Sequence, residues 1–479
     1  MGGTNLEKAM ATGTEASVRT LDDVNPANGE CLASIPIASE SDVRAAVARA
    51  RAAQPAWGAL ELSARLDALE AAAKEFEQPA LVDELARLIT AEMGKPIEQA
   101  RREAQGCAGG IRRLSQSAAE ALAPELHREG DTVTRLTREA LGVVAAITPW
   151  NFPLGMAREV IVPALVAGNS VVFKPSELVP LSGAALAEVL QRHLPAGVVE
   201  LVQGDEFTGK ALVAAEVDLV GFVGSVAAGK HIMAEASKGL KRLVLELGGK
   251  DPMIVCADAD LEAAADFAVR ESMRNTGQVC CSVERIYVEQ PAAEKFAELV
   301  VQRAQALTVG DGNSDVFMGP MATEQQRAHV LAQIEDARAK GARVLLGGGA
   351  REGAGWFMEA TVVADTNEEM ALLRDETFGP VATLRTVDSA EEALRLANDS
   401  CFGLGASVWA GDLERGRQLA ARVESGMVGV NRGLGGAGDP PWAGAKQSGF
   451  GFLGSPDGYR QFTRPLSVSW NEPAAGAAS

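Results

Sequence analysis

Three polar residues in apolar or constrained surroundings could together carry covalent chemistry on a carbonyl group. Cys280 lies in the segment Asn275–Cys281, whose glycine and amide side chains suit a bend that exposes a thiol nucleophile. Glu246 ends an apolar run, where burying a carboxylate is costly but a general base would be useful. Asn151 lies between two prolines in Thr148–Pro153, and a fixed side-chain amide can donate to an oxyanion. A thiol, a base and an oxyanion donor are the parts that acyl transfer requires.

Each of these residues also has a purely structural explanation. A buried cysteine usually behaves as a small apolar side chain. Glu246 could belong to an ion pair, and Asn151 to a simple turn between a strand and a helix. We expect Cys281 to serve in packing, because a vicinal disulfide with Cys280 would be strained.

Two glycine patterns resemble phosphate-binding loops. Gly433–Gly438 matches G-x-G-x-x-G, but Asp439–Pro441 follows it in place of a helix, so we interpret the match as accidental. Gly224–Lys230 follows a strand-like run and opens a helix, yet His231 stands where a P-loop needs Ser or Thr for Mg²⁺. An NTPase is therefore an alternative. The backbone N–H groups of these glycines could instead face a dinucleotide pyrophosphate, or the glycines could form a simple turn.

The elements that must position these residues belong to a long, acidic chain. Its 479 residues suggest two to four folding units. The chain has 45 Lys and Arg against 64 Asp and Glu, a formal charge of −19 that would repel nucleic acid and anionic membranes. Its apolar runs are too short to span a membrane. Six scattered cysteines favour a reducing compartment, so we expect a cytoplasmic protein without nucleic-acid or membrane partners, and we predict no metal site.

The hydrophobic pattern predicts an α/β fold with two lobes. Helical spacing dominates the first third of the chain, and short apolar runs alternate with helical stretches from Leu141 onward. Strands that are apolar on both faces indicate twisted parallel sheets covered by helices, and the pattern recurs after a boundary near Gly248-Gly249. The alternating segment Leu466–Trp470 predicts a half-buried strand that needs a partner. The other predicted strands are 141–147, 170–174, 198–203, 218–223, 242–247, 253–256, 285–288, 343–346, 381–387 and 406–409, with a helix over 182–193.

Eight short blocks resemble the aldehyde dehydrogenase superfamily, in that family's order and over essentially the whole chain. The resemblance implies a Rossmann-like NAD(P)-binding domain (1–121 and 141–248), a catalytic domain (249–445) and a small β oligomerisation arm (122–140 and 446–479). The arm would build a homodimer or homotetramer. The blocks are Glu92–Pro96, Thr148–Pro153, Lys174–Glu177, Phe222–Ser225, Glu246–Lys250, Gly277–Cys280, Glu376–Pro380 and Lys446–Gly449.

The resemblance also implies a reaction, the NAD(P)-dependent oxidation of an aldehyde to a carboxylic acid. Cys280 would form a thiohemiacetal whose oxyanion the Asn151 amide holds, and Glu246 would activate the water that hydrolyses the later thioester. The Glu177 carboxylate suits a free 2′-hydroxyl and repels a 2′-phosphate, which favours NAD, with NADP as the alternative. Glu376 would bind the nicotinamide ribose. The residues expected to bind the cofactor are Thr148, Trp150, Lys174, Glu177, Gly224, Ser225, Gly229, Glu376 and Phe378.

One residue points to the substrate. Arg274 matches an arginine that succinate-semialdehyde dehydrogenases use for the substrate carboxylate. Their second arginine is matched only by Arg158, one residue early, while Glu159 fills its place. We therefore predict a small aldehyde, either succinate semialdehyde or another. The alternatives are a CoA-acylating relative, which would lack the base at Glu246, and a non-catalytic structural member of the family.

Overall fold

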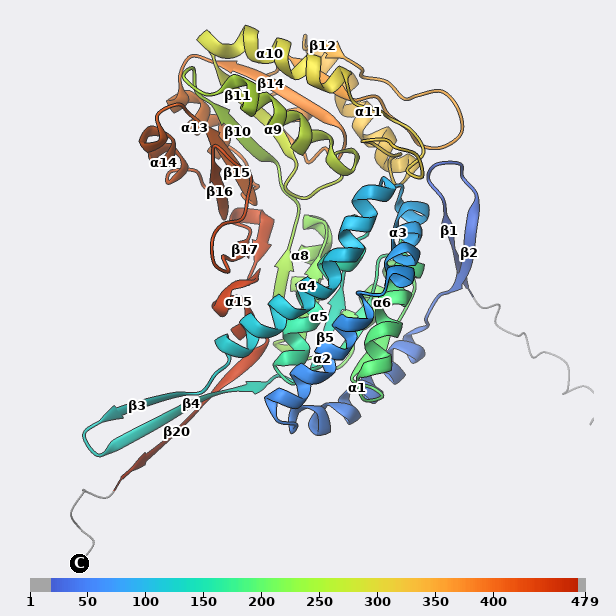
Figure 1. The fold of residues 1–479 in the computed structure, drawn as a ribbon, viewed down its shortest axis with the longest axis vertical. Coiled ribbons are helices and arrows are strands. Elements are labelled where there is room, and N and C mark those ends of the chain that lie inside the picture. The colour runs from blue at the N-terminus through green and yellow to red at the C-terminus, as the bar shows by residue number, and fades with distance from the viewer. Residues whose placement is uncertain (1–18, 473–479) are drawn as a thin grey trace, which may run out of the picture.

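Two helix-covered sheets and a projecting three-stranded arm make up the chain (Figure 1). The computed structural model describes residues 19–472. Each sheet is mostly parallel and buries both faces against helices, so the predicted α/β class with two lobes is confirmed. No helix within residues 19–472 is long and apolar enough to cross a membrane.

The first sheet has six strands with a helical layer on each face. In spatial order the strands are β18 (Gly449–Phe450), β9 (Arg242–Glu246), β8 (Leu219–Val223), β5 (Val143–Ile147), β6 (Ser170–Lys174) and β7 (Val199–Leu201). The helices are α1 (Glu40–Gly58), α2 (Leu62–Glu75), α3 (Pro79–Met93), α4 (Ile97–Ala121), α5 (Pro153–Val166), α6 (Pro180–His193), α7 (Glu206–Ala214) and α8 (Val226–Ala236). Alternate residues of β5 face opposite layers: Val144 and Ala146 join the core with α2–α6, and Val143 and Ala145 the core with α1, α7 and α8.

The second sheet has seven strands and follows the same plan. Its strands are β12 (Arg343–Leu346), β13 (Thr361–Ala364), β14 (Val381–Val387), β11 (Val283–Glu289), β10 (Asp251–Val255), β15 (Gly405–Trp409) and β16 (Met427–Val430). The helices are α9 (Leu261–Met273), α10 (Gln290–Gln305), α11 (Glu324–Ala339), α12 (Ala371–Arg374), α13 (Ala390–Asn398) and α14 (Leu413–Ala420). Met253 and Val255 pack with α9 and α10, whereas Ile254 packs on the opposite face with α13 and α14. The chain crosses from the first sheet to the second between β9 and β10.

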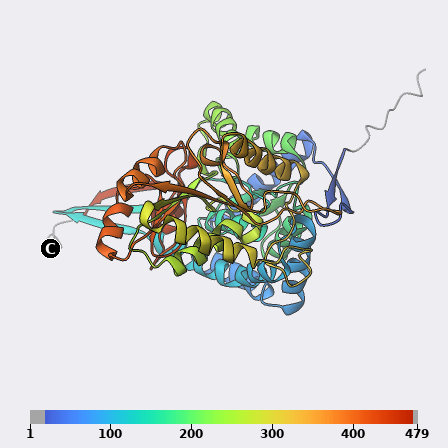
Figure 2. The same cartoon turned by 90° about the horizontal axis from the view of Figure 1, so that it is seen from above.

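The predicted C-terminal strand pairs within the chain and forms the arm. β20 (Thr463–Asn471) runs antiparallel to β4 (Thr132–Ala140), which pairs in turn with β3 (Glu125–Glu129). The arm projects from the body in both views (Figures 1 and 2). The C-terminal part of the chain also contributes β17 (Trp442–Ala443), β19 (Phe452–Leu453) and α15 (Ser455–Arg460).

A β-hairpin near the N-terminus was not predicted. β1 (Thr20–Val24) pairs with β2 (Cys31–Pro36), and the hairpin lies on the side of the body away from the arm (Figure 2). Its strands are rich in polar and exposed residues, so the sequence there lacks the apolar alternation that reveals a strand.

Candidate active site

A cavity of about 620 Å³ has walls from both lobes. The carboxyl ends of β8 and β9 reach it, and this edge of a parallel sheet is where α/β proteins usually bind ligands. Its lining residues are Pro149–Phe152, Met156, Val223–Ser225, Glu246–Gly248, Arg274, Val279–Cys281, Thr323, Gln325, Gln326, His329, Glu376, Phe378 and Trp442.

A strained bend presents the candidate nucleophile to this cavity. Asn275, Thr276 and Gly277 have φ angles of 53°, 57° and 70°. Such values are unfavourable for a β-branched residue such as threonine. At Gly277 an added Cβ would overlap the Gly379 carbonyl, so only glycine fits. The bend leads into Cys280, which is half-buried on the cavity wall.

The surroundings of Cys280 favour the neutral thiol. A hydrogen bond with the Cys281 thiol and burial raise the pKa of Cys280, and the negative charges of Asp251 and Glu246 act in the same direction. Attack on a carbonyl carbon requires the thiolate, so this proton must leave before the reaction.

Glu246 lines the same cavity as Cys280, at the end of β9. Its side chain is buried. One oxygen accepts a hydrogen bond from the Leu453 N–H (3.3 Å), and the other has no protein partner. Burial raises the pKa of Glu246 well above the usual carboxyl range, and within residues 19–472 no basic side chain offsets that burial. The carboxyl group therefore holds protons more strongly than an exposed one, as a general base working near neutral pH requires.

Asn151 is fixed from several sides. Its backbone carbonyl accepts from Lys95 Nζ (2.7 Å) and Asn275 Nδ2 (3.3 Å). Its side-chain Nδ2 donates to the Gln278 carbonyl (3.0 Å). An amide nitrogen carries two N–H groups, so one remains for an acceptor in the cavity beside Cys280.

The backbone N–H groups of the glycine turn after β8 were expected to face a pyrophosphate, but they donate to carbonyl groups of the protein. The N–H of Gly224 donates to the Glu246 carbonyl (3.0 Å), and the N–H of Gly229 donates to the Ser225 carbonyl (3.0 Å). Neither N–H is therefore free for a pyrophosphate. The first turn of α8, which Ser225 caps through Ala228, instead leaves N–H groups without helical acceptors. An anion would be bound by that helix end.

The other candidate cofactor residues lie in two places. Trp150 and Phe378 meet edge-to-face on the cavity wall, with ring centroids 5.6 Å apart. Thr148, Lys174 and Glu177 lie outside the cavity lining. Lys174 is buried and forms an ion pair with the exposed Glu177 at 3.6 Å.

Glu376 brings a carboxyl group to the cavity wall, close to the backbone between β9 and β10. It accepts a hydrogen bond from the Gly249 N–H (3.1 Å), and an added Cβ at Gly248 would overlap its carboxylate. Burial raises the pKa of Glu376 to about 8, and nearby Glu284 adds to that rise.

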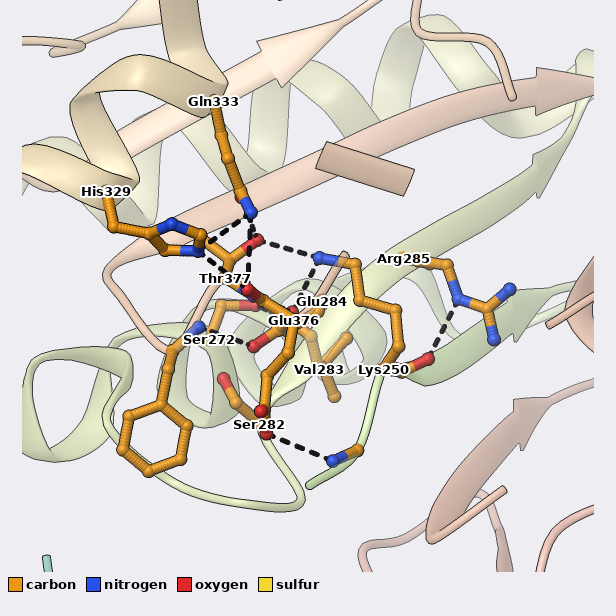
Figure 3. A network of polar contacts seen from close by, with 12 residues as sticks. Lys250, Ser272, Ser282, Val283, Glu284, Arg285, His329, Gln333, Glu376 and Thr377 are labelled. Atoms are coloured by element: carbon orange, nitrogen blue, oxygen red, sulfur yellow. Dashed lines mark hydrogen bonds and ion pairs between the residues drawn. The ribbon is translucent and has the colours of Figure 1, made fainter. Parts of the chain in front are cut away.

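The residues after Glu376 are held by a buried ion pair that the sequence did not reveal (Figure 3). Lys250 Nζ lies 2.6 Å from a Glu284 carboxylate oxygen and donates to Thr377 Oγ1 (2.7 Å). Glu284 also accepts from the backbone N–H groups of Thr377 (2.8 Å) and Phe378 (2.9 Å). Lys250 stood out only as the last residue of the block Glu246–Lys250, and Glu284 carries no local sequence signal.

The two candidate substrate arginines are separated. Arg274 lines the cavity, forms an ion pair with Glu271 (3.2 Å) and lies over the Phe152 ring at 5.7 Å. Arg158 lies outside the lining and donates to the Gly106 carbonyl on α4 (2.7 Å). Only Arg274 is therefore available to a ligand in this cavity.

Comparison with known proteins agrees with this geometry. The model of the aldehyde dehydrogenase family matches residues 13–468. A probable succinate-semialdehyde dehydrogenase [NADP(+)] of Sinorhizobium fredii is 39% identical, over 91% of this chain and 90% of that protein. A 3,6-anhydro-α-L-galactose dehydrogenase of Streptomyces coelicolor is 38% identical, over 95% of this chain and 94% of that protein. The crystal structure of lactaldehyde dehydrogenase from Escherichia coli superposes with a TM-score of 0.91 at 34% identity, covering 95% of this chain and 96% of that one. The chain therefore belongs to the aldehyde dehydrogenase family.

Proposed function

We propose that this NAD(P)-dependent aldehyde dehydrogenase oxidises a small aldehyde with a distal carboxylate, using Cys280, Glu246 and Asn151. The observation that carries the proposal is that a thiol, a buried carboxyl of raised pKa and a fixed amide line one cavity. The presence of a base at Glu246 supports hydrolysis over transfer to CoA.

The cavity has the groups that a nicotinamide dinucleotide would need. The free first-turn N–H groups of α8 suit a pyrophosphate. Within residues 19–472 the Glu376 carboxyl group accepts one hydrogen bond, from the Gly249 N–H, and ribose hydroxyls would supply others. When bound there, the cofactor supplies the hydride acceptor.

Each catalytic side chain has one task in the proposed reaction. Cys280 gives its thiol proton to solvent water, and the sulfur then bonds to the aldehyde carbon while the C=O π electrons pass to the oxygen. The free N–H of Asn151 donates to the oxygen that becomes negative, a contact of the kind that contributes about 10²–10³ in rate. After oxidation of the bound carbon, Glu246 accepts a proton from the water that attacks the thioester.

Cofactor choice depends on Glu177. Its carboxylate is exposed at the carboxyl side of β6 and would repel a 2′-phosphate, which supports NAD. The Sinorhizobium relative is named for NADP(+). A direct comparison of the two cofactors is therefore part of the test.

Arg274 supports the acidic substrate. A guanidinium on the cavity wall can form charge-assisted hydrogen bonds with a carboxylate, although Glu271 competes for it. The names of relatives from Sinorhizobium fredii and Escherichia coli, both succinate-semialdehyde dehydrogenases, also favour this class.

Assembly and location complete the proposal. We infer a homodimer or homotetramer built through the arm, because β20 is an edge strand with exposed Leu466, Val468 and Trp470. We also infer a cytoplasmic location, because the six scattered cysteines are all free thiols, which fits a reducing compartment.

The test is NADH or NADPH formation at 340 nm with succinate semialdehyde, butanal and 4-aminobutanal. We expect kcat/KM for succinate semialdehyde to exceed that for butanal by about tenfold, the lower end for a charge-assisted bond because of Glu271. Arg274→Leu should remove this preference and spare butanal. Arg270→Leu is the control, since Arg270 also contacts Glu271 (2.9 Å) but lies outside the lining. Equal wild-type values for the two aldehydes would contradict the acidic substrate.

A further inference from the structure

The peptide unit between Glu376 and Thr377 is held at both of its polar ends. Its N–H donates to Glu284 (2.8 Å), and Glu284 is held by the buried Lys250. Its carbonyl oxygen, on the other side, faces α11 (Figure 3). Because a peptide unit is planar, holding both ends fixes where the Glu376 Cα lies. The Gly249 N–H, which donates to the carboxylate (3.1 Å), holds the other end of the side chain.

Two side chains of α11 converge on this carbonyl oxygen. His329 Nε2 lies 3.1 Å from it and Gln333 Nε2 lies 3.2 Å from it. The two residues are four apart, so they share one face of the helix. A carbonyl oxygen has two lone pairs and can accept both hydrogen bonds.

A neighbouring hydrogen bond fixes the donor role of Gln333. Gln333 Oε1 accepts from Thr377 Oγ1 (2.8 Å), which turns the Gln333 amide nitrogen toward the carbonyl. For the carbonyl to accept from His329, the ring must carry its proton on Nε2. In that tautomer the two Nε2 atoms, 3.1 Å apart, both donate to the one oxygen; in the other tautomer His329 Nε2 would accept from Gln333. Protonation of His329 on Nε2 is therefore part of the inference below.

The two donors differ in burial, so substituting them should affect the fold differently. Gln333 is buried and belongs to the core around Thr377. His329 is exposed and lines the cavity. Removing the imidazole should therefore leave the fold intact while releasing one of the two bonds on the carbonyl.

We propose that His329, supported by Gln333, is a positioning residue for the cofactor: it holds the Glu376 peptide so that the carboxylate meets the nicotinamide ribose. This inference rests on the proposed role of Glu376. It assigns to α11 a task that neither its sequence nor its distance from Cys280 along the chain suggests.

The experiment measures NAD binding by quenching of intrinsic fluorescence, without aldehyde, and then steady-state kinetics. His329→Ala should raise the Kd and the KM for NAD by about three- to tenfold, the effect of one hydrogen bond. At saturating NAD, kcat should stay within about twofold. His329→Gln should restore much of the affinity, because its amide can donate to the same oxygen. Glu335→Ala, on the exposed side of α11, is the control and should change neither value.

A double-mutant cycle separates positioning from direct contact with the cofactor. In a Glu376→Ala background, His329→Ala should cause no further loss of NAD affinity. If the losses of NAD affinity in the two single variants add up in the double variant, His329 contacts NAD independently of Glu376. If His329→Ala alone leaves NAD affinity unchanged, His329 has no role in binding. Either result overturns the inference. The proposed function fails separately, if the wild type oxidises none of the aldehydes.

Discussion

Burial determines the chemistry of the ionisable groups on the cavity wall. It raises the pKa of Glu246 and of Glu376, and together with the Cys281 hydrogen bond it raises the pKa of Cys280. Perturbed groups that cluster in one cavity are typical of active sites, because buried charge is tolerated only where it has a use. We therefore expect the pKa of each of the three groups to change when a substrate, a water or a cofactor forms a hydrogen bond or a covalent bond with it.

Glu246→Gln should separate the two halves of the reaction. The amide cannot accept a proton from water, but formation and oxidation of the thiohemiacetal need no water. We therefore expect a burst of NADH close to one per active site, followed by steady turnover reduced by about 10²-fold or more. Rapid-mixing absorbance at 340 nm measures both phases. Full steady-state turnover in the variant would remove Glu246 as the base.

NAD affinity should rise with pH because of Glu376. Its pKa is about 8 in the structure, so the carboxyl group is mostly protonated at pH 7. Ribose hydroxyls donate best to the ionised form, so binding favours loss of the proton. The Kd for NAD should thus fall by up to about tenfold between pH 7 and pH 9 and level off above the pKa. Glu284 and Asp251 raise the pKa of this carboxyl group further, whereas the positive charge of Lys250 lowers it.

The control for this pH dependence is Glu376→Gln, measured by the same binding experiment. Its Kd should be weaker overall and nearly constant across the range. A wild-type Kd that does not change with pH would contradict a role for the carboxylate in binding.

At the scale of single elements, the bend at 275–277 shows how local strain serves the site. Residues in the left-handed region store of order 1–3 kcal/mol each and persist only where the surroundings hold them. Here the close Gly379 carbonyl allows only a glycine at position 277. The bend lies directly before Cys280, so its geometry sets the position of the thiol.

Gly277→Ala should therefore cost both stability and activity. An alanine must adopt the left-handed conformation, at about 1–2 kcal/mol, and its Cβ overlaps Gly379 in addition. Gly29→Ala is the matched control, because Gly29 has a similar φ of 77° with open space around it. We expect a clearly larger fall in Tm for Gly277→Ala than for Gly29→Ala, and fewer reactive Cys280 thiols only in the former. If Tm falls equally in Gly277→Ala and Gly29→Ala, the structure relieves the overlap with Gly379 without losing stability.

The success of prediction from sequence also differs by element. The strands at 170–174 and 381–387 were predicted with their observed bounds, because mostly buried apolar runs stand out in the sequence. The strand at 343–346 was also predicted with its observed bounds, although it is a partly exposed edge strand. The polar hairpin β1–β2 was missed. Among the candidate site residues, Cys280, Glu246 and Asn151 could be proposed because each stands out against its neighbours, and all three line the cavity. His329 and Gln333 were not, since their contact with Glu376 spans more than forty residues and leaves no local pattern. The N–H groups of Gly224 and Gly229 were misjudged because spacing alone cannot show which internal acceptors a turn already serves.

At the scale of the whole molecule, the arm has a strand edge that pairs with no other strand of the described chain. β20 pairs with β4 along one edge only, and its other edge is free within residues 19–472. Leu466, Val468 and Trp470 alternate along it and are all exposed. An edge strand with an apolar row invites pairing with another chain, so the arm is the place where we expect subunits to meet.

Charges on that apolar row should dissociate the assembly. Val468→Asp combined with Trp470→Asp places two carboxylates where a neighbouring subunit would have to bury them, which is costly without a cation. Ser467→Asp and Ser469→Asp together are the matched control, because alternate residues of a strand face opposite sides and the added charge is the same. Light scattering after size exclusion should give a multiple of one chain for the wild type and the serine variants, and a single chain for the Val468 and Trp470 variant. Since the cavity is built within one chain, the dissociated protein should still bind NAD. If the Val468 and Trp470 variant keeps the molar mass of the wild-type assembly, subunits meet elsewhere. If both double variants dissociate to single chains, added charge on the arm weakens assembly regardless of the apolar row.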